Sequence, residues 1–185
     1  MPFAYVSIGS NVDKEIYVPA SLRALERYFG DLLVSRVYEN QPVGFDGEAF
    51  FNLVVGFASR LGARQIAAIL RKLELAHGRT SRCHKFAPRT LDLDLILYGD
   101  QIIDEDGLRI PREDIQRYAF VLEPLAEIAP DLVHPVLKMS YRDMWAAFDK
   151  QGWERRLLPL AGLTIQTASA VDSNDLPGHI LSVQC

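Results

Sequence analysis

The sequence has few of the features that mark specialised protein classes. Its 185 residues include two cysteines, Cys83 and Cys185, which form neither a disulfide framework nor a CxxC metal pair. The apolar runs, such as Leu53–Ala58, are far shorter than the roughly 20 residues that a membrane-spanning helix needs. The first residues, Met1–Ala4, have no basic segment of the kind that opens a secretory signal. We therefore expect a cytoplasmic protein with no membrane partner.

An excess of positive charge is also absent, because 20 Lys and Arg stand against 24 Asp and Glu, for a net charge of −4. Proteins that bind nucleic acid are usually basic, so we expect no nucleic-acid partner. The distribution of charge is more informative. The segment Arg79–Arg89 contains four cations and no acid, and Asp92 and Asp94 follow directly. A local cation cluster beside two carboxylates indicates one phosphate-handling site rather than an extended basic surface.

The composition is that of a globular domain. Hydrophobic residues make up 49% of the chain, and 12 glycines and 10 prolines are too few for a disordered or collagen-like protein. The length fits one compact domain. We predict a single domain over residues 1–160 and a C-terminal extension of unknown role over residues 161–185, where the hydrophobic pattern weakens.

The hydrophobic pattern predicts the element order β-α-β-β-α-β, followed by a mixed tail. The four strands and two helices are expected at Phe3–Ile8, Tyr17–Phe29, Leu32–Tyr38, Phe50–Ala58, Ala63–His77 and Thr90–Tyr98. Later elements are expected at Ile102–Ile103, Leu108–Ile110, Asp114–Ala129 with an interruption at Pro124, and Tyr141–Lys150. This order is the split βαβ arrangement of ferredoxin-like folds. The fold class is α+β, an antiparallel sheet with helices on one face and ligand loops on the other.

The fourth expected strand carries the strongest candidate site. Alternation places Asp92 and Asp94 on one face of the sheet and the leucines at positions 91, 93, 95 and 97 on the other. Carboxylates at i and i+2 lie roughly 7 Å apart along a strand, which suits one or two hard cations such as Mg²⁺. The alternative is a solvated strand face. The basic segment beside the pair favours a site for phosphoryl transfer.

Two loops border the same face. The arginines of residues 79–89 can bind phosphate oxygens bidentately, and the loop can close over a polyphosphate, although a solvated turn is the alternative. The loop Gln41–Gly47 leads to Phe50 and Asn52, an aromatic ring and an amide that can hold a flat heterocycle. Ordinary packing under a loop is the alternative there. Gly9–Asn11 is predicted to be a tight turn, and Glu74 either supports the basic loop or is a surface glutamate.

Several motifs occur together in a fixed order. They are Tyr5–Asn11, Pro42–Gly44, Phe50–Asn52, Gly78–Arg79, Pro88–Leu95, Phe120–Leu125 and Ile128–Pro130. In this combination the chain resembles the 6-hydroxymethyl-7,8-dihydropterin pyrophosphokinases of folate biosynthesis, over roughly Phe3 to Pro135. The resemblance implies a ferredoxin-like fold and transfer of the pyrophosphoryl group of ATP to the pterin hydroxymethyl group, with release of AMP.

The resemblance also implies roles for individual residues. Asp92 and Asp94 would hold two Mg²⁺ ions. The arginines that act on the phosphates would be Arg79, Arg82 and Arg89. The pterin would contact Pro42, Val43, Gly44, Phe50, Asn52 and Phe120. The nucleotide side would comprise Arg71, Glu74, Lys85, Phe86, Leu95 and Arg112. The partners would be ATP and a dihydropterin, and the protein would be a monomer or a weak homo-oligomer.

The chain departs from the family pattern mainly on the nucleotide side. Arg112 stands where the family usually has histidine, and Tyr118 stands where it usually has arginine. Phe86 and Ala87 replace a usual tryptophan and glycine. One alternative is therefore a divergent paralogue that binds a pterin with weak or altered transferase activity. Another is a non-enzymatic interaction or RNA-binding module, which the paired aspartates disfavour because they would repel a phosphate backbone.

Overall fold

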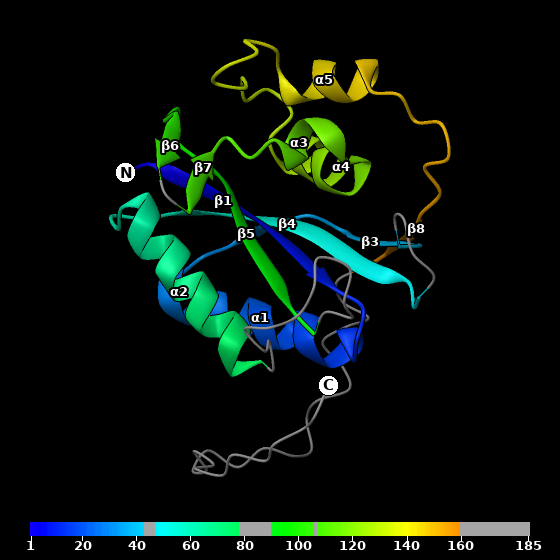
Figure 1. The fold of residues 1–185 in the computed structure, drawn as a ribbon, viewed down its shortest axis with the longest axis horizontal. Helices are drawn as coiled ribbons and strands as arrows, with labels where there is room; N and C mark the ends of the chain where they lie inside the picture. Colours follow the sequence, from blue (N-terminus) through cyan, green and yellow to red (C-terminus); the bar gives the residue numbers. More distant parts are fainter. Residues whose placement is uncertain (43–46, 78–89, 106, 160–185) are drawn as a thin grey trace.

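The chain folds around one antiparallel sheet in a computed structural model that describes residues 1–42, 47–77, 90–105 and 107–159. The strand order is β5-β1-β4-β3-β8, and β2 also pairs with β4 (Figure 1). The strands are β1 Phe3–Ser10, β2 Leu33–Val34, β3 Val37–Asn40, β4 Phe50–Ala58, β5 Asp92–Tyr98 and β8 Arg156–Leu158. The last, first, third and second of the four predicted strands are neighbours in this order, which is the ferredoxin-like arrangement. The predicted α+β, ferredoxin-like fold is confirmed.

Two helices cover one face of the sheet, as expected. These are α1, Lys14–Phe29, and α2, Ala63–Ala76 (Figure 1). Their buried side chains pack with alternate residues of β1, β4 and β5 in the first hydrophobic core. In β4 the residues on this face are Phe51, Leu53, Val55 and Phe57, the four that the alternation predicted. Burial of these side chains supplies the main driving force for folding.

The opposite face is only partly open, which corrects the expectation that helices cover one face. Three further helices, α3 Asp114–Arg117, α4 Ala119–Ile128 and α5 Tyr141–Ala147, lie on that side (Figure 1). Their apolar residues form a second core with Tyr5, Val54 and Ile96 of the sheet. From the sequence this face was expected to be free for ligands, because the alternation places Phe50 and Asn52 there. On the same face, Asp92 and Asp94 of β5 stay partly exposed.

A β-bulge in β5 overturns one prediction. In the pairing of β5 with β1, Tyr5 lies opposite Leu97 and Val6 opposite Leu95, so Ile96 is an extra residue. The bulge reverses the alternation after Leu95. Leu97 therefore packs in the second core instead of sharing the face of the leucines at positions 91, 93 and 95. A regular alternation of leucine contains no sign of the extra residue.

Several element boundaries also differ from the expectations. β1 continues through Ser10, so Gly9 and Ser10 are strand residues rather than a turn. The helix expected over Asp114–Ala129 is interrupted at Tyr118, whose backbone is extended, and Pro124 lies within α4. A helix can keep such a proline at the loss of one backbone hydrogen bond.

The remaining strands form a hairpin, in which β6, Ile103–Glu105, pairs with β7, Leu108–Ile110. Both were expected near these positions. Among the described residues, no helix combines the length and the hydropathy needed to cross a membrane.

Candidate active site

Three neighbouring strands place the acidic pair beside the amide residue. In the sheet register, Gly9 of β1 lies opposite Asp92 of β5 on one side and opposite Asn52 of β4 on the other. A Cβ atom at Gly9 would lie 3.2 Å from Oδ1 of Asn52, closer than such atoms normally approach. Glycine thus leaves a gap in the row between the carboxylate and the amide. Asp94, two residues along β5, lies opposite Ser7.

The amide of Asn52 has a fixed orientation. Its Nδ2 donates a hydrogen bond of 2.8 Å to Oδ1 of Asn40, and both side chains are buried. Asn40 in turn donates to the carbonyl oxygen of Gln41, at 2.9 Å. Because Nδ2 is held by Asn40, Oδ1 of Asn52 is directed toward Gly9 and the acidic strand. Asn40 could not be identified from the sequence, because its contact with Asn52 arises only when β3 pairs with β4.

Two side chains hold the start of β5 in place. Glu74 of α2 accepts a hydrogen bond of 2.9 Å from the backbone N–H of Leu93, between the two aspartates. Glu74 is 5% exposed, so its interpretation as a surface glutamate is wrong. Ser10 donates its hydroxyl to the carbonyl oxygen of Thr90, at 2.6 Å. These bonds fix the backbone from which both carboxylates project.

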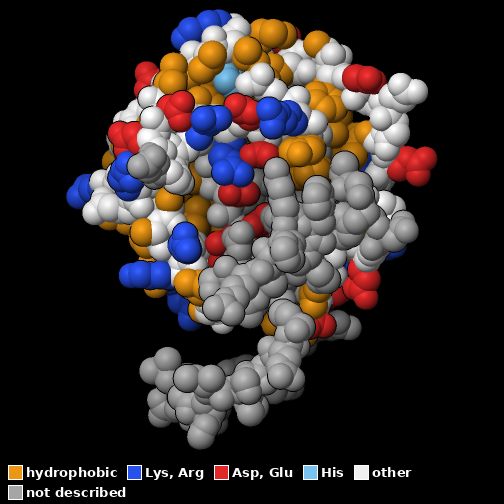
Figure 2. Space-filling model, viewed as in Figure 1, with side chains coloured by type: hydrophobic (Ala, Val, Ile, Leu, Met, Phe, Trp, Pro, Cys, Tyr) orange, Lys and Arg blue, Asp and Glu red, His pale blue; other side chains and the backbone are white. Residues whose placement is uncertain are grey.

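Arg112 contacts Asp94, one of the two aspartates of β5. Its Nη2 lies 3.4 Å from Oδ1 of Asp94, and its Nε donates to Oδ2 of Asp114 at 2.8 Å. Burial alone would lower the pKa of Arg112, but the negative charges of Asp94, Asp114 and Asp92 outweigh this and raise it. The guanidinium therefore stays charged beside the carboxylates. On the face shown in Figure 2, acidic and basic side chains are mixed near the centre rather than forming a surface of one sign.

The predicted pterin contacts are partly described. Phe50 is the first residue of β4, lies opposite Asn40 and is half-buried, on the same face as Asn52. Phe120 is half-buried near the start of α4 and stacks on Tyr118, with ring centroids 4.9 Å apart. Pro42 is half-buried as well. The expected convergence of Phe50, Asn52 and the aspartates on one face is confirmed by the register.

Of the remaining predicted site residues, some lie outside the described parts of the chain and others are exposed or buried. Seven lie outside the described residues: Val43, Gly44, Arg79, Arg82, Lys85, Phe86 and Arg89. Arg71 is exposed on α2. Leu95 is 5% exposed in the first core, so it offers little surface to a base. Its contact with adenine stays a prediction.

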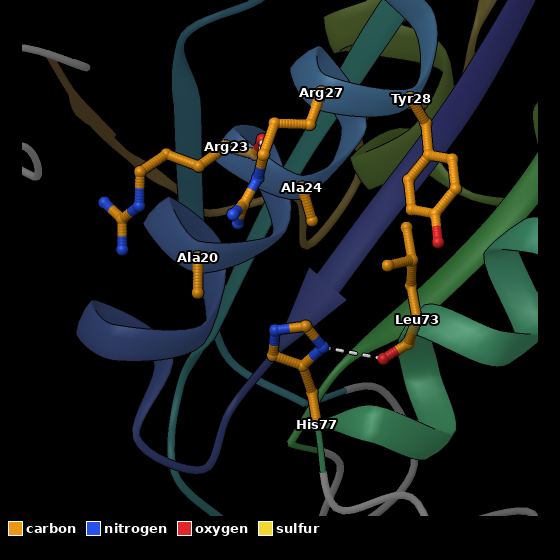
Figure 3. Close-up of a pocket in the computed structure, with 7 residues that line it drawn as sticks. All are labelled: Ala20, Arg23, Ala24, Arg27, Tyr28, Leu73 and His77. Carbon is orange, nitrogen blue, oxygen red and sulfur yellow. Dashed lines mark hydrogen bonds between the residues drawn. The ribbon is translucent and has the colours of Figure 1, made fainter. Parts of the chain in front are cut away.

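A groove of about 470 Å³ opens on the face of the sheet that α1 and α2 cover, opposite the face of the aspartates. Figure 3 shows it between α1 and α2, with the side chains of Arg23 and Arg27 on one side and Tyr28 and Leu73 on the other. His77 closes its end and bonds the carbonyl oxygen of Leu73, at 2.6 Å. The groove brings together none of the candidate site residues, so it is not the site that the sequence predicts.

The donor set at the acidic pair fits magnesium. Within the part of the chain that the structure describes, no cluster of three or more His, Cys, Asp or Glu side chains could hold a metal ion. Asp92 and Asp94 would supply two carboxylate ligands, and no third acidic or His side chain of the described residues completes such a cluster with them. Both aspartates are partly exposed. Magnesium usually takes one or two carboxylates and completes its coordination with water and substrate phosphates. The pair therefore suits an ion that arrives with a phosphate ligand better than a closed structural site.

Comparison with known proteins agrees with this geometry. The family model of 7,8-dihydro-6-hydroxymethylpterin-pyrophosphokinase (HPPK) matches residues 5–130. The chain belongs to the HPPK family. Among its relatives, the 2-amino-4-hydroxy-6-hydroxymethyldihydropteridine pyrophosphokinase of Pseudomonas aeruginosa is 39% identical, over 71% of this chain and 83% of that protein. The protein of the same name from Aquifex aeolicus is 30% identical, over 77% of this chain and 90% of that protein.

Solved structures support the HPPK fold. A chain described as HPPK-DHPS in complex with substrates aligns with 82% of this chain, with a TM-score of 0.65 and 13% identity. The wild-type HPPK-DHPS of Plasmodium falciparum aligns with a TM-score of 0.67 and 13% identity, over 82% of this chain. This chain spans 44% and 46% of those two chains. At this identity the likeness is one of fold.

Proposed function

We propose that this chain transfers the pyrophosphoryl group of ATP to the hydroxymethyl group of 6-hydroxymethyl-7,8-dihydropterin and releases AMP. The observation that carries the proposal is the row formed by Asp92, Gly9 and Asn52 across three strands. It places a carboxylate pair suited to metal-bound phosphates beside an amide suited to the edge of a flat heterocycle. The identity of 39% to a curated pyrophosphokinase favours this activity over the divergent paralogue.

The pterin side is formed by β4 and α4. Phe50 and Phe120 would stack on the two faces of the ring, and Asn52 would recognise its polar edge. Asn40 would hold the amide of Asn52 so that Oδ1 accepts a hydrogen bond from the pterin. Pro42, with Val43 and Gly44, would complete the pocket through the backbone. A rigid pocket of this kind positions the hydroxymethyl oxygen for attack on the β-phosphorus of ATP.

The phosphate side is formed by β5, Arg112 and the basic segment. Asp92 and Asp94 would hold two Mg²⁺ ions, which when bound supply positive charge against the phosphate oxygens. Arg79 and Arg89 would bind the phosphates, and Arg82 and Lys85 would close over them and exclude water. Arg71, Glu74, Phe86 and Leu95 would lie on the nucleotide side. A cytoplasmic location and a monomeric or weakly associating state stay predictions.

Replacing either aspartate tests the proposal. Asp92→Ala and Asp94→Ala should each lower pterin-dependent AMP release by at least about a hundredfold. Each variant removes a ligand of the Mg²⁺ ions whose positive charge would stabilise the transferring phosphates. The melting temperature should change little, since both side chains are partly exposed. Asp100→Ala, at an exposed turn after β5, is the matched control and should keep full activity. Near-wild-type turnover in either aspartate variant would refute the role of the pair.

A further inference from the structure

Arg112 is held in place from two sides. Its backbone N–H donates to the carbonyl oxygen of Ile96, the extra residue of the β5 bulge, at 3.0 Å. Its Nε donates to Asp114, so one edge of the guanidinium is fixed. The other edge, through Nη2, lies 3.4 Å from Asp94. A permanent positive charge therefore lies against one of the two carboxylates expected to hold metal.

A cationic side chain directly beside an expected metal ligand is unusual for a metal site. The guanidinium beside Asp94 takes up space that a divalent cation would need. Its positive charge also weakens the negative potential that would attract such a cation. The side chains of Arg112 and Asp94 are 37% and 40% exposed, so water weakens their attraction and the pair can separate. A triphosphate brings its own negative charge and its own metal ion. It thus offers Arg112 a second partner when the ion reaches Asp94.

We propose that Arg112 is an internal counter-ion that competes with free divalent cations for Asp94, so that the metal enters with the nucleotide rather than before it. In the protein without ligands, Arg112 neutralises Asp94 and keeps the affinity for metal alone low. When a metal–nucleotide complex arrives, the guanidinium turns from Asp94 to the phosphates. This inference rests on the proposed function, because it takes the aspartates as ligands of a metal–ATP complex.

Mn²⁺ binding to the full chain, without nucleotide or pterin, tests the competition. Arg112→Gln should bind Mn²⁺ roughly three- to tenfold more tightly than the wild type in a titration followed by electron paramagnetic resonance. Arg112→Lys, which keeps the charge, should stay close to the wild type. Arg109→Gln is the matched control and should leave Mn²⁺ affinity unchanged. Arg109 lies on β7 and pairs with Asp104 of β6 and with Glu113, the residue before α3.

A second readout separates competition from a merely structural role. In the presence of Mg²⁺, the affinity of Arg112→Gln for ATP should fall about tenfold or more while its affinity for Mn²⁺ alone rises. An unchanged Mn²⁺ affinity, or a fall in both affinities together, would overturn the proposal. The titration uses neither pterin nor turnover. Failure of the proposed reaction would therefore appear in the AMP assay, and failure of the competition would appear here.

Discussion

Gly9 and Asn40 shape the site although neither side chain has a group for catalysis. Gly9 contributes no side chain to the row between Asp92 and Asn52, and a methyl group there would crowd Oδ1 of Asn52. Asn40 supplies the acceptor that holds Nδ2 of Asn52. Buried amides are costly to leave unpaired, so this bond selects one orientation of Asn52.

Asn40→Ala should weaken binding of the dihydropterin by about five- to thirtyfold, because Asn52 loses the acceptor that orients its amide. Binding of ATP with Mg²⁺ should stay unchanged, since Asn40 lies on β3 and away from β5. Fluorescence titration of the pterin and calorimetry of the nucleotide measure the two effects. Gln101→Ala, an exposed amide beyond β5, controls for loss of an amide in general. An unaltered pterin affinity in Asn40→Ala would rule out the orienting role.

Among the elements, β5 shows what the sequence could and could not predict. Its position, its acidic face and the leucines at positions 91, 93 and 95 follow from alternation, because burial of one face imposes a period of two. The bulge at Ile96 could not be predicted, since any residue type can be inserted there. Arg112, which contacts Asp94, donates its backbone N–H to the carbonyl oxygen of this extra residue. The alternation along β5 thus predicted the positions of Asp92 and Asp94. The counter-ion of Asp94, Arg112, comes from a contact between distant parts of the chain and could not be predicted.

The junction of α1, β3 and β4 is built around a buried lysine. Lys14 is 9% exposed, and its Nζ donates to the carbonyl oxygen of Ala49 at 2.6 Å and pairs with Glu39 at 3.1 Å. The same ammonium lies 4.6 Å from the ring centroid of Phe51. Ala49 directly precedes Phe50, so Lys14 fixes the backbone from which the expected pterin-stacking ring projects.

Lys14→Met should lower the free energy of unfolding by about 1–3 kcal/mol, because the carbonyl of Ala49 and the carboxylate of Glu39 lose a buried donor while the apolar stem is kept. Dihydropterin affinity should fall as well, and affinity for ATP should not. Urea denaturation and ligand titrations provide the measurements, with Lys72→Met on the exposed side of α2 as the control. Stable protein with normal pterin affinity would contradict the anchoring role.

At the scale of the whole molecule, two hydrophobic cores pack on the two faces of the sheet. The first core, under α1 and α2, was predictable from the apolar faces of those helices. The second core was not, since its sheet residues, such as Tyr5 and Val54, alternate singly with those of the first. The family could be predicted nonetheless, because its motifs are short contiguous segments. Asn40 and Glu74 belong to contacts between elements, and their partners become visible only in the folded chain.

The nucleotide product tests the central claim most directly. The full chain is mixed with Mg²⁺, ATP and 6-hydroxymethyl-7,8-dihydropterin, and the nucleotides are separated by anion-exchange chromatography. The account predicts AMP in equal amount to the pterin consumed, and no AMP when the pterin is omitted. Transfer of two phosphoryl units from ATP leaves AMP, whereas transfer of one leaves ADP. Formation of ADP, or the absence of any pterin-dependent nucleotide product from protein that binds the pterin, would contradict the proposed reaction.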